Sequence, residues 1–250
     1  MKIHGRRAIT ALATITPLLL TAALGAAGPA TAAPAAPAAP THYDHALHAQ
    51  PVQHANQIWG GYAMTGETYT SVTGSWTVPT LNCSATRNSA VSPWIGIDGW
   101  SSSSVEQIGF DQDCTNGVAG YFPWVEMYPA NSIYFTETVK AGDHIDATVS
   151  VSGTTFTLTE SDTTQGWSKT YHETGSYALS SAEAILEDLG SNIPQVAGFG
   201  SVNFTNLTAN GVAFASAGTA NATSIERRNT LLTKNSALGS GSFSISWLHA

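Results

Sequence analysis

Residues 69–79 read YTSVTGSWTVP, and this stretch decides the fold class. Its apolar side chains Val72, Trp76 and Val78 alternate with Ser and Thr at the positions between them. A period of two places successive side chains on opposite faces of a strand, whereas a helix needs a period near 3.6. The stretch therefore predicts a β-strand with one buried face and one polar face.

The same alternation recurs along most of the chain after Trp59. It is found in HIDATVSVSG (144–153), TFTLT (155–159), VAFAS (212–216) and SFSISWL (242–248). Gly, Asn, Ser and Thr separate these runs, as expected for turns between short strands. We predict an all-β chain of antiparallel strands, folded as a two-sheet β-sandwich or a barrel.

One segment, SSAEAILEDLGS (180–191), fits two structures. Ala182, Ile185, Leu186 and Leu189 have helical spacing, and Ser180 with Glu183 forms a capping box. The segment also alternates as a strand, with Glu183, Ile185, Glu187 and Leu189 on one face and Ala184, Leu186 and Asp188 on the other. Local propensity alone favours a short helix.

The first residues predict export from the cell. A basic start, MKIHGRR, precedes an apolar stretch rich in small residues. We interpret residues 1–33 as a signal peptide, and no later run is apolar enough for a membrane anchor. Residues 34–55 are rich in Ala, Pro and then His, which is typical of a linker or short pro-segment. Residues 56–250 fit a single domain.

Charge limits the partners of the exported chain. Beyond the signal peptide it has six Lys or Arg against seventeen Asp or Glu, a net charge of −11 with His neutral. Such a surface argues against binding to nucleic acid or to an anionic membrane. The small number of Lys and Arg residues fits an enzyme that works at acidic pH. It fits equally well a protein that only needs to be soluble in an extracellular medium.

The two cysteines, Cys83 and Cys114, predict one disulfide, because exported proteins mature in oxidising surroundings. No His or further Cys stands at metal-ligand spacing, so a metal site is not expected. We also expect no other cofactor.

The stretch WIGIDGWSSSSVEQIGFD (94–111) raises the question of function. Alternation turns Ile95, Ile97, Ile108 and Phe110 towards a core. The opposite faces of this stretch and of YFPWVEMYP (121–129) then carry Trp94, Asp98, Gln107, Asp111, Trp124, Glu126 and Tyr128, with Gly96 and Gly109 between them. Aromatic and carboxylate side chains without Lys or Arg fit an ordinary exposed surface, a carbohydrate site or another enzyme site.

Six motifs in order resemble the glutamic peptidases, or eqolisins. They are WGGY (59–62), YTSVTGSWTVP (69–79), WIGIDG (94–99), EQIGFD (106–111), WVEMYP (124–129) and AEAILED (182–188). The resemblance implies a sandwich of two antiparallel sheets like that of the concanavalin A-type lectins and glucanases. It also implies an endopeptidase that acts on proteins or peptides at acidic pH without metal or cofactor.

The resemblance also implies roles for single residues. Gln107 falls on the family's catalytic glutamine and Glu187 on its catalytic glutamate. The positions that line or support the cleft are Trp59, Trp94, Asp98, Asp111, Trp124, Glu126 and Tyr128. The Glu187 segment is a strand in this family, which overrides the helical preference. Glu183 and Asp188 remain alternative bases.

The sequence also allows other interpretations of its function. A carbohydrate-binding or glucan-hydrolysing sandwich has the same architecture, but the chain lacks the E-x-D-x-x-E spacing that many such enzymes carry on one strand. A third reading is a cell-wall structural domain with an inactive site. The His-rich part of residues 34–55 is a spacer or, alternatively, a pH-dependent cover of the acidic groove. We expect a secreted monomer.

Overall fold

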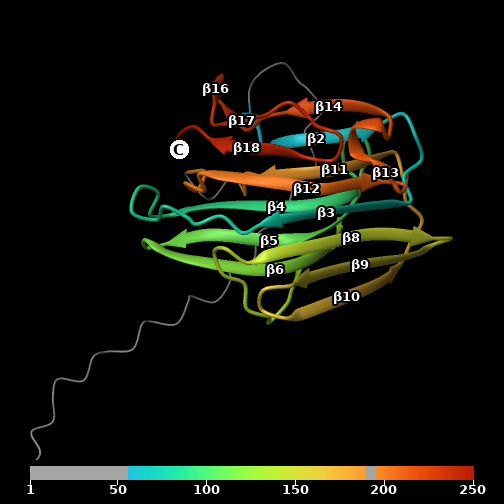
Figure 1. Ribbon diagram of the computed structural model, residues 1–250, viewed down its shortest axis with the longest axis horizontal. Coiled ribbons are helices and arrows are strands. Elements are labelled where there is room, and N and C mark those ends of the chain that lie inside the picture. Colours follow the sequence, from blue (N-terminus) through green and yellow to red (C-terminus); the bar gives the residue numbers. More distant parts are fainter. Residues whose placement is uncertain (1–55, 190–194) are drawn as a thin grey trace, which may run out of the picture. The chain divides into compact units, whose positions relative to one another are not determined.

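The computed structural model describes residues 56–189 and 195–250, and they form two large antiparallel sheets (Figure 1). The signal peptide and the His-rich segment predicted above lie outside the described residues. The seven-stranded sheet has the order β14 (Thr219–Thr223), β2 (Trp59–Thr65), β11 (Ser181–Glu187), β4 (Ser89–Asp98), β5 (Val105–Thr115), β6 (Val118–Tyr128) and β7 (Ile133–Tyr134).

The eight-stranded sheet has the order β10 (Trp167–Thr174), β9 (Thr155–Asp162), β8 (His144–Ser152), β3 (Ser71–Thr77), β12 (Ser201–Ala209), β18 (Phe243–Trp247) and β17 (Thr233–Asn235), with β13 (Val212–Ala213) beside β12. A small third sheet joins β1 (Asn56–Gln57), β15 (Glu226–Arg227) and β16 (Thr230–Leu231). The described residues contain no α-helix. The predicted all-β sandwich is confirmed.

The main hydrophobic core lies between the two large sheets and follows the predicted alternation. Trp76 on β3 stacks on Phe110 of β5 at a centroid distance of 6.0 Å. On its own sheet Trp76 also contacts Phe204, at 5.4 Å. Both Trp76 and Phe110 are buried, and aromatic pairs of this kind add to the stabilisation that burial provides. Ile95, Ile97 and Ile108 face this core as the sequence predicted.

The segment with two possible structures is a strand. β11 pairs with β2 on one side and with β4 on the other, so every residue from Ala182 to Glu187 has partners in both neighbours. Ser180 does not cap a helix, because its backbone N–H and its hydroxyl both donate to Asp98 at 2.7 and 2.9 Å. Tertiary pairing therefore overrides local helix propensity here.

One predicted strand is wrong in most of its length. In VAFAS (212–216) only Val212 and Ala213 pair in a sheet, and a 3₁₀ helix follows at Phe214–Ser216. The backbone N–H of Ala217 donates to the carbonyl of Phe214 and closes this turn. Phe214 is buried whereas Val212 is 47% exposed, so these two residues do not share a buried face.

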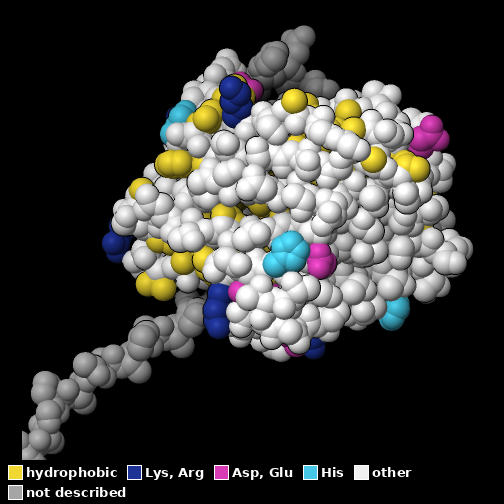
Figure 2. Space-filling view, viewed as in Figure 1, with side chains coloured by type: hydrophobic (Ala, Val, Ile, Leu, Met, Phe, Trp, Pro, Cys, Tyr) yellow, Lys and Arg dark blue, Asp and Glu magenta, His cyan; other side chains and the backbone are white. Residues whose placement is uncertain are grey.

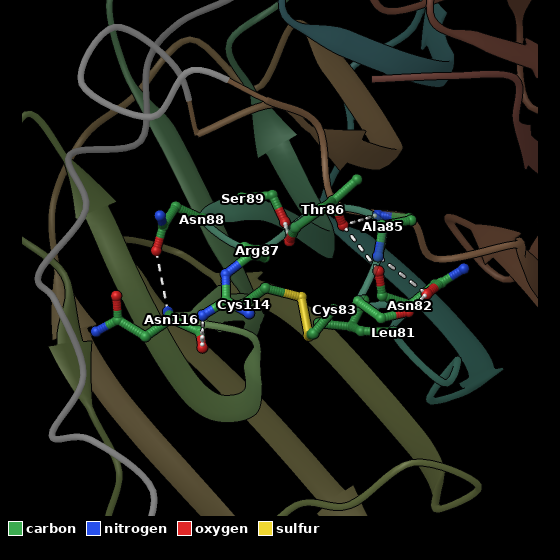
Figure 3. Close-up of a disulfide and its surroundings, with 12 residues drawn as sticks. Leu81, Asn82, Cys83, Ala85, Thr86, Arg87, Asn88, Ser89, Cys114 and Asn116 are labelled. Carbon is green, nitrogen blue, oxygen red and sulfur yellow. Dashed lines mark hydrogen bonds between the residues drawn. A yellow bond between two sulfur atoms is a disulfide. The ribbon is translucent and has the colours of Figure 1, made fainter.

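The predicted disulfide between Cys83 and Cys114 is present, with Cα atoms 5.3 Å apart (Figure 3). It connects the segment between β3 and β4 to the end of β5. Around it, the Arg87 guanidinium donates to the carbonyl of Asn116 at 2.9 Å, and the N–H of Asn116 donates to the side chain of Asn88. The bridge thus fixes the strand that carries Gln107.

Removing the disulfide should destabilise the fold. The cysteines are separated by 31 positions, and closing a loop of that length stabilises a folded chain by about 3–4 kcal/mol in the chain-entropy model. We expect the Cys83→Ala/Cys114→Ala variant to lose that amount in urea unfolding at pH 4. An unchanged unfolding midpoint, with the wild-type disulfide verified by mass, would contradict this expectation.

No helix in the described part of the chain combines the length and apolarity needed to cross a membrane. The face of the molecule seen in Figure 2 carries few Lys, Arg, Asp or Glu side chains and is largely neutral. The exposed sides of β8, β9 and β10 contribute Ser and Thr in register, for example Thr148, Thr159 and Thr170.

Candidate active site

The second hydrophobic cluster lies on the face of the seven-stranded sheet that is turned away from the main core. Its buried members are Trp59, Trp94, Val105, Trp124 and Ile185. Gln107 is two residues after Val105 on β5, and Glu187 is two residues after Ile185 on β11. Side chains two positions apart on a strand point to the same face, so Gln107 and Glu187 both belong to this one. We call it the site face.

Gln107 is held in a fixed orientation by Glu126 on the neighbouring strand. The two residues are register partners in β5 and β6. The Gln107 Nε2 donates to Glu126 Oε2 at 2.6 Å, and Ser132 Oγ donates to Glu126 Oε1 at 2.9 Å. A carboxylate can only accept, so the amide nitrogen must point towards Glu126. This leaves the second amide N–H and the Oε1 of Gln107 directed elsewhere.

The remaining amide groups of Gln107 are in a setting that suits a ligand. The side chain is fully buried, and its Oε1 has no hydrogen-bond partner among the described residues. A buried carbonyl oxygen without a partner is costly, and such atoms in proteins usually require an explanation. An oxygen and an N–H on the same fixed amide can accept from one ligand atom and donate to another.

Glu187 is the last residue of β11, between Trp59 on β2 and Ser92 on β4. Trp94 Nε1 donates to Glu187 Oε2 at 3.0 Å. An indole N–H can only donate, so it requires an acceptor oxygen at this position. The Glu187 side chain is 1% exposed.

The indole of Trp94 spans the interval between the two candidate residues. Gly96 on β4 is the register partner of Gln107 on β5 and, on its other side, of Glu183 on β11. Glu187 lies four positions beyond Glu183 along β11. A Cβ built on Gly96 would be 3.1 Å from Trp94 Cζ3 and 3.1 Å from Gln107 Cβ. One edge of the ring is therefore beside Gln107 while its N–H reaches Glu187.

Gly109 makes room for this indole. A Cβ at Gly109 would lie 2.6 Å from Trp94 Cβ and 2.3 Å from the carbonyl oxygen of Pro93. Neither distance is tolerated between such atoms, so only glycine fits here.

Two other carboxylates near Glu187 are less suited to act as a base. Burial raises the pKa of Glu183 well above its usual value, and the charges of Asp98 and Glu106 raise it further. Glu183 is therefore protonated in acid. Asp188 forms an ion pair with Arg227, whose Nη2 is 2.6 Å from Asp188 Oδ2.

Asp98 and Asp111 have structural partners. Asp98, at the end of β4, accepts from the backbone N–H groups of Leu179 and Ser180 at 2.7 Å each. These bonds fix the start of β11. Asp111 accepts a hydrogen bond from the hydroxyl of Tyr134.

The aromatic residues predicted for the site are brought together. Trp59 and Trp94 meet edge to face with ring centroids 4.9 Å apart. Trp124 Nε1 donates to Ser92 Oγ at 3.0 Å. Tyr128, with Trp100, Tyr134 and Ile58, packs against this cluster from its partly buried rim.

The predicted exposure of these side chains is wrong. Alternation places Trp94, Gln107 and Trp124 on the outer face of the sheet, but each has 0% exposure. Large indole rings on strands less than 5 Å apart pack against one another and cover the polar groups between them. Glu126, at 3%, is also buried.

Sequence analysis missed three partners of the site. Ser92, two residues before Trp94, shares its face by alternation and could have been found from that pattern. Ser132 and Tyr134 follow the β6 strand in PANSIYF (129–135), where no local pattern points to Glu126 or Asp111. In the described ranges, no group of three or more His, Cys, Asp and Glu side chains is arranged to hold a metal ion.

Comparisons with known proteins identify the family. The family model described as the peptidase A4 family matches residues 57–247. Aspergillopepsin-2 of Aspergillus niger is 31% identical over 209 residues, which cover 72% of this chain and 74% of that protein.

Solved structures show the same fold. Scytalido-glutamic peptidase with a peptide-based transition-state analogue has a TM-score of 0.66 and 28% identity, over 76% of this chain and 98% of that one. SCP-B, an eqolisin in complex with the tripeptide Ala-Ile-His, has a TM-score of 0.63 and 26% identity over the same shares. Aspergilloglutamic peptidase from Aspergillus niger has a TM-score of 0.56 and 30% identity, over 64% of this chain and 99% of that one.

The matched family model covers the strands that carry Gln107 and Glu187, and the relatives share both the sequence and the sandwich. The chain belongs to the peptidase A4 family, the glutamic endopeptidases.

Proposed function

We propose that Glu187 is the general base and Gln107 the oxyanion-stabilising group of this endopeptidase. The observation that carries the proposal is the fixed Gln107 amide, whose Nε2 donates to Glu126 at 2.6 Å and whose Oε1 has no partner among the described residues. It lies on the same face as Glu187, whose carboxylate is oriented by Trp94. The two groups need no metal to polarise the peptide carbonyl.

The proposed chemistry uses these two side chains together. A water bound by Glu187 and by the Gln107 Oε1 gives a proton to Glu187 as its oxygen attacks the peptide carbonyl. The second N–H of Gln107 donates to the oxygen that becomes negative in the tetrahedral intermediate. Glu187 then passes its proton to the leaving amine, and the C–N bond breaks.

An amide suits this role in acid because it does not titrate. Gln107 remains a donor at every working pH, so only one carboxylate has to be ionised. Glu183 takes no part in this scheme, since it is protonated, and Asp188 takes none because Arg227 engages it.

We also propose that the enzyme is secreted and acts as a monomer on proteins or peptides. Support comes from the disulfide Cys83–Cys114, which forms in oxidising compartments, and from the basic and apolar start of the sequence. We expect no contact with nucleic acid or membrane, because the exported chain is strongly acidic.

The experiment is proteolysis of an unfolded protein substrate by the purified chain at pH 3–4 and at pH 7. We expect cleavage in acid that a chelator does not inhibit, and a kcat about 10²–10³-fold lower for Gln107→Ala, the usual loss when one oxyanion donor is removed. Gln112→Ala is the matched control, since Gln112 is a fully buried glutamine on the core face of the same strand. Equal activity of the two variants would contradict the role of Gln107.

A further inference from the structure

Asp188, directly after Glu187, is bound by one arginine. Arg227 Nε donates to Asp188 Oδ2 at 2.9 Å, and Arg227 Nη2 donates to Oδ1 at 2.7 Å and to Oδ2 at 2.6 Å. The Asp188 side chain is 1% exposed and that of Arg227 is 28% exposed. A two-pronged pair of this kind fixes orientation as well as charge.

The chain brings Arg227 to this point through a tight hairpin. Arg228 and Asn229, with φ of 50° and 62°, form the two-residue turn between β15 and β16. β15 also pairs with β1, so that Arg227 is the register partner of Asn56. The backbone N–H of Asp188 donates to the carbonyl of Ile58 at 2.7 Å. The end of β11 is thus tied by its backbone to the residue after β1 and by the Asp188 side chain to β15.

Several strands around Glu187 carry titratable groups. Glu183 and Asp188 belong to its own segment, Asp98 to β4, Glu126 to β6, and Arg227 with Glu226 to β15, while β5 carries Glu106, Asp111 and Asp113 and Lys234 on β17 is exposed. β2 and β4 place Trp59, Ser92 and Trp94 beside Glu187, which carry no charge. An unneutralised Asp188 would therefore add a buried negative charge next to a carboxylate that must itself become negative.

We infer that Arg227 is a positioning residue for Glu187: it fixes the end of β11 through Asp188 and neutralises the charge adjacent to the base. The inference rests on the proposed role of Glu187. It explains why a chain with six cations beyond the signal peptide uses one of them on a buried aspartate beside the site. Without this pair, the negative charge of Asp188 would oppose that of the base, and the acid limb of the activity would move to higher pH.

The test is the pH profile of kcat/KM, whose acid limb reports the ionisation of the base in the free enzyme. For Arg227→Met we expect the acid limb to move to higher pH by about 1 unit, the lower end of the effect that a neighbouring charge has on a carboxyl pKa. For Asp188→Asn, which leaves the arginine charge, we expect a move to lower pH. The double variant Asp188→Asn/Arg227→Met should return the limb to the wild-type position.

Lys169→Met is the matched control. Lys169 forms an ion pair of 2.6 Å with Glu137, and its side chain is 42% exposed on β10 of the other sheet. Its removal should leave the acid limb in place. If Arg227→Met does not fold, the other two variants still test the inference. The acid limb of Asp188→Asn should lie at lower pH than that of the wild type, and the limb of the double variant should lie at the wild-type position.

Two results overturn the inference. One is a lower melting temperature of Arg227→Met with an unmoved acid limb, which would make the pair purely structural. The other is a limb that moves equally in Arg227→Met and in the double variant. Failure of the proposed function is distinct from both, because it would appear as full activity of Glu187→Gln whatever the arginine variants do.

Discussion

Replacing Glu187 by glutamine is expected to lower kcat/KM in acid by about 10²–10⁴-fold, the contribution of a positioned general base. Glutamine keeps the shape of the side chain and can still accept from Trp94 Nε1, which donates to Glu187 Oε2 at 3.0 Å. The variant therefore removes the proton acceptor while it preserves the packing. The measurement is steady-state hydrolysis of a peptide substrate at pH 4.

Glu183→Gln is the matched control for this prediction. Glu183 lies on the same strand and face, is fully buried, and burial raises its pKa well above the usual value. A neutral amide replaces a carboxyl that is already neutral, so we expect activity close to that of the wild type. An inactive Glu183→Gln beside an active Glu187→Gln would assign the base to Glu183 instead.

The second large effect is a loss of stability as pH rises. Burial raises the pKa of Glu106 from 4.5 to about 9, and it raises the pKa of Glu160 and of Glu183 well above 4.5. In the unfolded chain these carboxyls ionise near pH 4.5, so above that pH unfolding releases protons that the folded chain retains. Each group then lowers the free energy of unfolding by about 1.4 kcal/mol per pH unit up to its folded-state pKa.

For Glu106 alone this amounts to about 3 kcal/mol between pH 4.5 and pH 7. Below pH 4.5 the three groups are protonated in both the folded and the unfolded chain, so they do not make the free energy of unfolding depend on pH. The pKa values of Glu137 and Glu173 are lowered, by Lys169 and by the backbone N–H of Thr174 respectively, but both side chains are only partly buried and offset little of this loss. The fold is therefore most stable under acidic conditions.

Urea unfolding at pH 4, 5.5 and 7 measures this dependence. We expect Glu106→Gln to retain more of its stability at pH 7 than the wild type does, because the amide has no proton to release. Glu137→Gln, at a partly buried carboxylate whose pKa is lowered and not raised, should leave this loss of stability between pH 4 and pH 7 in place. Equal wild-type stability at pH 4 and pH 7 would show that the buried carboxyls do not remain protonated.

Much of the fold could be predicted because period two is a local property of the sequence. It located the strands around Trp76, Ile95 and Phe110 and gave them the correct buried faces. It failed at 212–216, where a short turn buries Phe214 without a sheet partner. For β11 the local signal favoured a helix, and pairing on both sides with β2 and β4 decided for the strand.

The site was predictable in its members but not in its contacts. The resemblance supplied Gln107, Glu187 and the aromatic residues around them, and alternation gave their common face. The bonds of Glu126 to Gln107 and Ser132 depend on how β5, β6 and the following segment meet in space. The pairing of Asp188 with Arg227 joins residues 39 positions apart, and no local pattern contains it.

The carbohydrate-active alternative shares this architecture but lacks support in the site. A retaining glucanase needs two catalytic carboxyls about 5–5.5 Å apart, one of them ionised and one protonated. On the site face Glu126 is engaged by an amide and a hydroxyl, and the central residue beside it is Gln107. Membership of the peptidase A4 family decides for peptide hydrolysis.

The most direct test of the account is a double-variant cycle of kcat/KM at pH 4 with Gln107→Ala, Glu187→Gln and their combination. Residues that act as one unit give losses that do not multiply. We predict that the double variant is about as inactive as the worse single variant. Losses that multiply, or a Gln107→Ala enzyme within about threefold of the wild type where an oxyanion donor should supply 10²–10³, would contradict the Gln107–Glu187 mechanism.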